Sequence, residues 1–171
     1  LDHAEVGIAL TRQSRFVLVS HHFCRVFRCD KSDVLGQPSR TIYPSSEAYD
    51  ELAAKARPAF IEHGAYDCEV MLKRHTGQEF WARMRGRAVE PGDTSKGTIW
   101  TIEDVTAARE HREQLTFSAT HDSLTGLCNR AAFEQLLDKS TVAASPEQFS
   151  ALFIDLDRFK QVNDLYGHEV G

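Results

Sequence analysis

The 171-residue sequence has few cysteines and no long apolar run, and each absence excludes a class of protein. The four cysteines form no CxxC pair, so we predict neither a zinc site nor a disulfide framework and expect reduced thiols in a cytoplasmic protein. Apolar runs such as residues 151–154 fall far short of the roughly 20 residues that a membrane helix needs. We therefore expect no membrane segment, and Leu1 does not open a signal peptide.

An excess of positive charge is also missing. Lys and Arg number 20, Asp and Glu number 25, and the formal net charge is −5. No sequence-wide positive field is therefore available to hold a polyanion, and nucleic acid is not an expected partner. With 42% hydrophobic and 26% charged residues, the composition is that of a globular protein with a real core, in one large domain or two small ones.

The first half of the chain alternates between the periods of strands and helices. Residues 7–13 and 15–20 are short apolar runs separated by the polar pair Gln13-Ser14, which predicts a hairpin. Ser20 is a suitable N-cap for a short helix that follows. A longer helix is expected from Ser45 or Ser46, with Pro58 interrupting or kinking it and Gly64 ending it.

From Tyr66 the period becomes 2, which predicts two antiparallel strands joined by the turn at residues 75–78. Arg83, Arg85 and Arg87 alternate with apolar residues and indicate a solvated face of the sheet, with an anion or partner contact as the less favoured alternative. A flexible loop at residues 91–97 then leads to a third strand at 98–105. The predicted order is β-β-α-α-α-β-β-β.

Several segments in this order resemble a PAS sensor domain over about residues 5 to 106: VGIALTRQSRFVLVSHHFCRVF, DVLGQPSRTIYP, GQEFWARMRGRAV and IWTIEDVT. The resemblance implies an α+β fold, a five-stranded antiparallel sheet with helices on one side. It also marks Asp104 and Thr106 as the junction between the last strand and an output helix. Either side chain can accept a backbone N–H of that helix. We assign residues 1–106 to the PAS domain and 107–119 to a signalling helix.

The helix over 107–119 places Ala108, Leu115 and Ala119 near heptad spacing, but over only about two heptads. A dimer seam and a plain linker are both consistent with this pattern. We expect a homodimer formed through the PAS domain and this helix.

The sequence disfavours three kinds of sensor site in the PAS domain: a flavin adduct, a haem site and a metal cluster. Flavin-binding photosensors of this family carry a reactive cysteine after the short helices, and residues 35–44 contain none. His63 as a haem ligand, and His21-His22 with Cys24 as a metal cluster, are less favoured than solvated or capping histidines.

The next segment combines a predicted strand, two carboxylates and a helix. Residues 149–156 read as a buried strand that ends in Asp155 and Asp157, and an amphipathic helix follows from about Arg158 to Gly167. Carboxylate oxygens beside the free N–H groups of a helix N-terminus are suited to magnesium and a triphosphate. The alternative is a solvated turn or a helix cap.

Residues 120–171 resemble the start of a GGDEF domain, the diguanylate cyclase family, which has an α/β nucleotide-cyclase-like fold. The resemblance lies in two motifs, HDSLTGL with Asn129-Arg130, and FIDLDRFK with Asn163-Asp164 and Gly167-His168. It implies condensation of two GTP molecules to cyclic di-GMP with Mg²⁺.

The family's functional groups map onto the second motif, residue by residue. Asp155 and the backbone carbonyl of Leu156 would bind Mg²⁺, with Asp157 in a supporting role. The amides of Phe159 and Lys160 would contact phosphate, and Asn163 would bind guanine.

The GGDEF signature itself is not among these residues, so we expect the 171-residue chain to lack cyclase activity while its parent protein makes cyclic di-GMP under PAS control. One alternative is a catalytically inactive, GTP-binding GGDEF domain that regulates a cyclic di-GMP phosphodiesterase. Another is a module that only binds a ligand and dimerises.

Overall fold

The computed structural model describes residues 6–90, 93–142, 152 and 154–167. The chain forms two compact units, Leu1–Gly126 and Leu127–Gly171. None of the described helices is long and apolar enough to cross a membrane.

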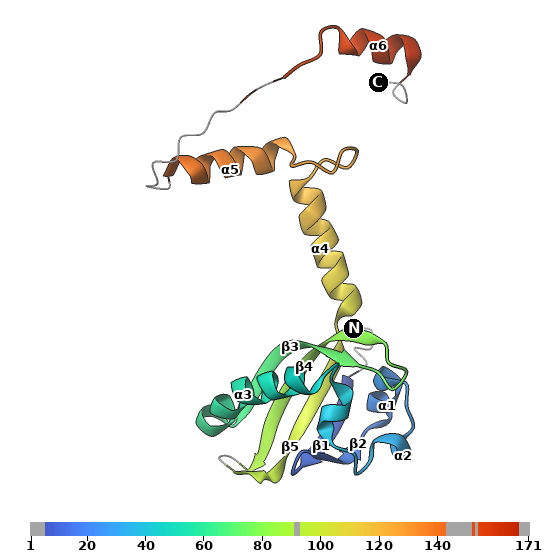
Figure 1. Ribbon diagram of the computed structural model, residues 1–171, viewed down its shortest axis with the longest axis vertical. Coiled ribbons are helices and arrows are strands. Elements are labelled where there is room, and N and C mark those ends of the chain that lie inside the picture. Colours follow the sequence, from blue (N-terminus) through green and yellow to red (C-terminus); the bar gives the residue numbers. More distant parts are fainter. Residues whose placement is uncertain (1–5, 91–92, 143–151, 153, 168–171) are drawn as a thin grey trace. The chain divides into compact units, whose positions relative to one another are not determined.

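The first unit is built on one antiparallel sheet with the strand order β2-β1-β5-β4-β3 (Figure 1). Its strands are β1 (Val6–Arg12), β2 (Arg15–Val19), β3 (Ala65–Lys73), β4 (Glu79–Glu90) and β5 (Asp93–Asp104). The predicted hairpin is present, and both residues of its turn, Gln13 and Ser14, have positive φ as a tight hairpin turn requires. The predicted five-stranded PAS fold is confirmed.

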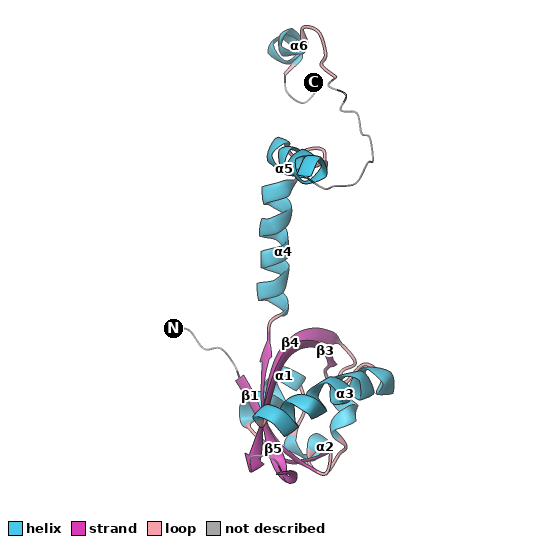
Figure 2. Ribbon diagram, turned by 90° about the vertical axis from the view of Figure 1, so that its left-hand side faces the viewer, coloured by secondary structure: helices cyan, strands magenta, loops and turns pink. Residues whose placement is uncertain are grey.

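The helices of this domain lie on one face of the sheet (Figure 2). They are α1 (His21–Phe27), α2 (Lys31–Val34), the 3-10 helix η1 (Ser39–Ile42) and α3 (Ser46–His63). Ser20 caps α1 as predicted, because its Oγ accepts the N–H of Phe23 at 3.1 Å, and it also accepts the N–H of Ile8 at 3.0 Å. That second bond ties the cap to β1.

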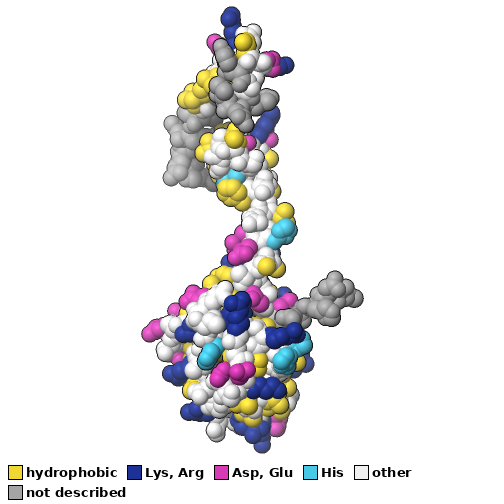
Figure 3. Space-filling view, turned by 90° about the vertical axis from the view of Figure 1, so that its right-hand side faces the viewer, with side chains coloured by type: hydrophobic (Ala, Val, Ile, Leu, Met, Phe, Trp, Pro, Cys, Tyr) yellow, Lys and Arg dark blue, Asp and Glu magenta, His cyan; other side chains and the backbone are white. Residues whose placement is uncertain are grey.

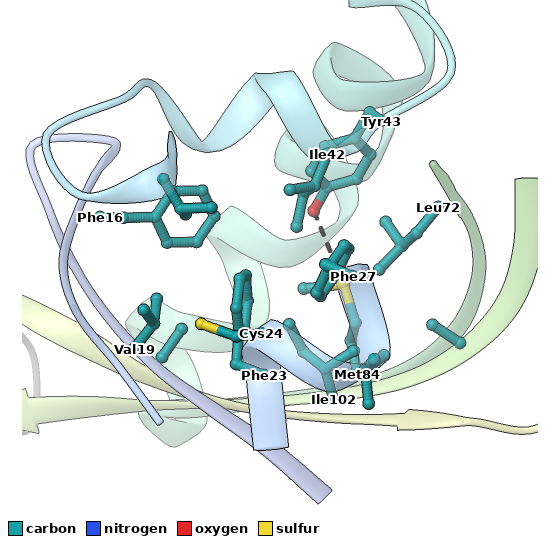
Figure 4. Packing of buried hydrophobic residues seen from close by; sticks show 14 of the residues in the cluster. Phe16, Val19, Phe23, Cys24, Phe27, Ile42, Tyr43, Leu72, Met84 and Ile102 are labelled. Atoms are coloured by element: carbon teal, nitrogen blue, oxygen red, sulfur yellow. Dashed lines mark hydrogen bonds between the residues drawn. The ribbon is translucent and has the colours of Figure 1, made fainter. Parts of the chain in front are cut away.

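The core lies between this helical layer and the sheet (Figure 4). Phe23 and Phe27 of α1 stack with ring centroids 4.3 Å apart and are almost without exposure, at 0% and 1%. Gly7 of β1 permits this approach, because a Cβ at that position would lie 2.9 Å from the Cα of Phe23. Burying rings of this size is a main source of stability in a domain of this length.

Two details differ from the prediction. Helix α3 runs without interruption through Pro58, whose missing N–H would have bonded to the carbonyl of Ala54. Both residues are exposed, so water can satisfy that carbonyl. The loop expected at residues 91–97 is shorter than predicted, because β5 already begins at Asp93 and pairs there with Glu90.

The connecting helix α4 (Thr106–Thr120) forms as predicted and has no buried residue. The second unit contains α5 (Arg130–Val142), for which the sequence analysis made no prediction, and α6 (Phe159–Tyr166), which confirms the predicted helix.

The strand predicted at 149–156 is not found where it can be assessed. Residues 149–151 and 153 lie outside the described residues. Leu152 and Ile154 belong to no strand and are 83% and 81% exposed. No described residue of this unit offers a neighbouring strand, and a strand without a partner leaves its backbone groups unpaired.

Candidate functional site

A cavity of about 560 Å³ opens between α3 and the sheet. Buried side chains form its floor, among them Phe16, Leu52, Phe60, Met84 and Ile102. Its mouth is bordered by exposed residues of three elements: the β1–β2 turn, the start of β5 and the second half of α3. Its volume lies in the range of small-molecule binding sites.

Two polar groups are buried in the wall of this cavity. The hydroxyl of Tyr43 lies 3.7 Å from the sulfur of Met84, which is a weak acceptor (Figure 4). Burial raises the pKa of Tyr43 well above its ordinary value, so the phenol stays protonated and remains a donor. Trp100 donates its indole N–H to the hydroxyl of Thr11 at 3.0 Å, so this pair is already satisfied.

The histidines considered as sensor ligands do not form a site. His63 is exposed near the end of α3, and its Nε2 lies 3.7 Å from Glu62. His21 and His22 are exposed on α1, whereas Cys24 is buried. Within the described residues no three His, Cys, Asp or Glu side chains are grouped so that they could hold a metal ion.

Cys29, just after α1, is a poor nucleophile. Burial, with Cys24 as a close neighbour, raises the pKa of Cys29 to about 12. Since the thiolate is the reactive form, this side chain is inert at neutral pH.

The junction between β5 and α4 is fixed by three hydrogen bonds from backbone N–H groups, two of them to side-chain oxygens. Asp104 accepts the N–H of Thr106 through Oδ1 at 3.0 Å. Thr106 accepts the N–H of Trp81 through Oγ1 at 3.0 Å, and Val105 donates its N–H to the carbonyl of Trp81 at 2.9 Å. Asp104 therefore holds the first N–H of α4 as expected. Thr106 does not cap the helix but binds β4 instead.

Two arginines that the sequence analysis did not identify complete this junction. Arg74 is only 9% exposed, and its guanidinium donates to Asp104 and to the carbonyl of Val26 at the end of α1. Arg109 of α4 lies 3.9 Å from the ring centroid of Trp81. Neither contact could be predicted, because each depends on which strands are neighbours in the sheet.

The outer face of the sheet carries the predicted arginines. Arg83 and Arg85 both bind Asp67, at 3.0 and 3.1 Å. The hydrogen bond from Arg83 is the main cause that holds the pKa of Asp67 below its ordinary value. Figure 3 shows another side of the PAS domain, on which basic and acidic side chains are likewise interspersed.

In the second unit, the predicted magnesium and phosphate groups contact each other. Phe159 donates its N–H to the carbonyl of Leu156 at 3.2 Å. This N–H was expected to be free for a phosphate, but it is already hydrogen-bonded. Asp155 accepts the N–H of Leu156 at 2.9 Å. The carboxylates of Asp155 and Asp157 are exposed, which suits hard cation ligands, but they do not complete a metal shell with any other described residue.

Asn163 and Lys160 both lie on α6. The amide oxygen of Asn163 is buried and accepts no hydrogen bond from the part of the chain that the structure describes. Lys160 is exposed. A buried acceptor without a hydrogen bond lowers the stability of the folded state, and a donor on a ligand would remove this penalty.

The chain matches two protein families in succession. Residues 5–107 match the PAS domain family, and residues 119–171 match the family described as diguanylate cyclase, GGDEF domain. Among solved structures it is similar to the PAS domain, in complex with ethanol, of a LuxR-family transcriptional regulator from Burkholderia thailandensis. The TM-score is 0.56 and the identity 29%, over 58% of this chain and 88% of that one.

Curated relatives carry names from cyclic di-GMP metabolism. The probable diguanylate cyclase DgcE of Escherichia coli is 48% identical over 44% of this chain and 7% of its own length. The cyclic di-GMP phosphodiesterase PdeR of Escherichia coli is 33% identical over 81% of this chain and 21% of its own length. The chain thus spans about a fifth or less of these two relatives. It belongs to the PAS domain family, whose model covers residues 5–107, and its residues 119–171 are similar to the diguanylate cyclase GGDEF domain.

Proposed function

We propose that this chain is the sensory and connecting part of a cyclic di-GMP signalling protein. Its PAS domain binds a small ligand, and α4 carries the response to a GGDEF domain that condenses two GTP molecules to cyclic di-GMP. A cytoplasmic homodimer formed through the PAS domain and α4 would bring two such domains together.

The observation that carries this proposal is the junction at the start of α4. Helix α4 has no buried residue, yet its first turn is fixed to the sheet by Asp104, Thr106 and Arg109. A helix whose first turn is held by the sheet can transmit a displacement of the sheet along its axis. The cavity supplies a place where a ligand could act, and a 29% identical PAS domain binds ethanol.

In the second unit we assign roles by the motif that the chain shares with its family. Asp155 and the Leu156 carbonyl would hold Mg²⁺, which neutralises phosphate charge when bound, and Asp157 would support the loop. The amides of Phe159 and Lys160 would contact phosphate. Because the Phe159 amide donates to Leu156, nucleotide binding would have to open this contact or share the carbonyl.

Asn163 would accept a hydrogen bond from guanine through its amide oxygen, the buried acceptor that is left without a donor.

The test is turnover of GTP by the whole protein that contains this chain. Purified protein is incubated with GTP and Mg²⁺, and the product is identified by chromatography and mass. Formation of cyclic di-GMP supports the proposal, and GTP binding without product refutes the cyclase role.

A second candidate function has its own support. The match to the phosphodiesterase PdeR covers 81% of this chain and so includes both the PAS and the GGDEF parts. In this alternative the GGDEF domain binds GTP without turnover and regulates a phosphodiesterase. Hydrolysis of cyclic di-GMP that increases when GTP is added would favour it.

A further inference from the structure

The cavity under α3 has a mouth of one charge sign. Arg57 is the one charged residue among the described residues that line it, and no described aspartate or glutamate does. Its side chain is exposed and forms no hydrogen bond or ion pair with any described residue. The guanidinium of Arg40 lies 5.5 Å from the ring centroid of Tyr49, which also lines the cavity.

The rest of the mouth supplies hydroxyl groups. Ser14 and Ser95 are exposed, and Ser39 is half-buried. Each hydroxyl can donate one hydrogen bond to an anion. A free guanidinium beside such donors is suited to an acidic group.

The floor of the cavity favours a different chemistry. Apolar side chains dominate it, so the part of a ligand that reaches the floor gains by leaving water. The buried hydroxyl of Tyr43 donates only to a sulfur, and it adds one weak polar contact at most. The ligand is therefore apolar at one end and anionic at the other.

We infer that this cavity binds an amphipathic carboxylic acid, with the carboxylate paired to Arg57 at the mouth and the hydrocarbon part on the floor. One guanidinium matches one carboxylate through two parallel hydrogen bonds. A phosphate carries more charge than this single free arginine neutralises. The inference rests on the sensory role proposed above and names the class of ligand.

The test uses the 171-residue chain and three probes of equal length: decanoate, decan-1-ol and decylammonium. The chain has two tryptophans, and Trp100 lines the cavity. A Trp81→Phe background makes Trp100 the only tryptophan, so that selective excitation of tryptophan reports on the cavity, and it keeps an aromatic ring beneath Arg109. We expect decanoate to bind at least about tenfold more tightly than decan-1-ol, and decylammonium to bind more weakly than both.

Variants then separate the two ends of the ligand. Arg57→Gln is expected to remove the preference for decanoate and to leave decan-1-ol binding unchanged, and Arg57→Lys to keep part of the preference. Arg87→Gln, an exposed arginine of β4 that does not line the cavity, is the matched control and should change neither affinity. Ala53→Phe places a ring in the cavity and should weaken the binding of decanoate and of decan-1-ol alike.

Equal affinity for decanoate and decan-1-ol would overturn the inference, and so would an undiminished preference in Arg57→Gln. Binding of none of the probes would overturn it as well. In each case the cyclase assay on the whole protein still decides the proposed function, because that assay does not depend on these probes.

Discussion

The guanidinium of Arg74 donates to the carboxylate of Asp104, although the two residues are 30 positions apart in the chain. Arg74 follows β3, and Asp104 ends β5. The same guanidinium lies 4.1 Å from the ring centroid of Phe80 and also donates to the carbonyl of Val26. This one side chain therefore joins the end of α1 to the residue that holds the first N–H of α4.

Replacing Asp104 tests this pair through its pH dependence. Partial burial raises the pKa of Asp104, but hydrogen bonds from Thr106 and Arg74 outweigh burial and leave the pKa below its ordinary value. The pKa of an unfolded Asp is about 3.9. The carboxylate therefore contributes stability in full above about pH 5 and loses it as the pH falls through the lower folded pKa.

We expect Asp104→Asn to lower the free energy of unfolding by about 1 to 2 kcal/mol at pH 7. The difference from the unsubstituted chain should shrink below about pH 4, measured by urea unfolding across the pH range. Asp67→Asn is the control. Its partners Arg83 and Arg85 are exposed, so this substitution should lower the free energy of unfolding by less. A loss that stays constant down to pH 3 would contradict the role of the charge.

Thr106 should stabilise the attachment of α4 through its hydroxyl. Thr106→Val keeps the shape of the side chain but leaves the N–H of Trp81 without its acceptor, at a cost of about 1 kcal/mol. Exchange of the Trp81 amide hydrogen should become about fivefold faster. Thr106→Ser keeps the hydroxyl and should behave like the unsubstituted chain. If the Trp81 amide exchanged equally slowly in Thr106→Val and Thr106→Ser, the hydrogen bond to Thr106 would not stabilise this junction.

Gly86 should tolerate no side chain. A Cβ there would lie 2.6 Å from Trp100 and 2.7 Å from Phe60, which belong to the cluster beside the cavity. We expect Gly86→Ala to lower the free energy of unfolding by about 1 to 3 kcal/mol through overpacking.

Gly36→Ala is the matched control for Gly86→Ala. A Cβ at Gly36 meets no atom within 4 Å, but its φ is +78°, so backbone strain alone should cost about 1 to 2 kcal/mol. Only Gly86→Ala should change the fluorescence of Trp100. A Trp100 spectrum unaffected by Gly86→Ala would show that the rings have room to move.

Asp155 separates metal binding from helix capping. In the whole protein, Asp155→Asn removes one negative charge from the proposed magnesium site, so GTP turnover should fall severely. The side chain is exposed and forms one hydrogen bond with a described residue, the next one in the chain, so the melting temperature without magnesium should hardly change. Near-normal turnover together with a lower melting temperature would instead assign Asp155 a structural role.

Some features followed from the sequence because they depend on neighbouring residues. Ser20 and Ser45 cap helices that begin one residue later, and Gly64 ends α3 in the left-handed conformation that glycine adopts readily. The alternation of β4 assigned Arg83 and Met84 to opposite faces of the sheet. The segment at 149–156 had the composition of a strand, but its described residues have no partner strand.

The tertiary structure alone decided which distant groups meet. Arg74 and Asp104 pair because β3 and β5 both neighbour β4, and Arg57 faces a cavity because α3 crosses the sheet opposite the β1–β2 turn. Caps and periodicity are encoded within a few residues, whereas these contacts depend on strand order and register, which the packing of the whole core selects.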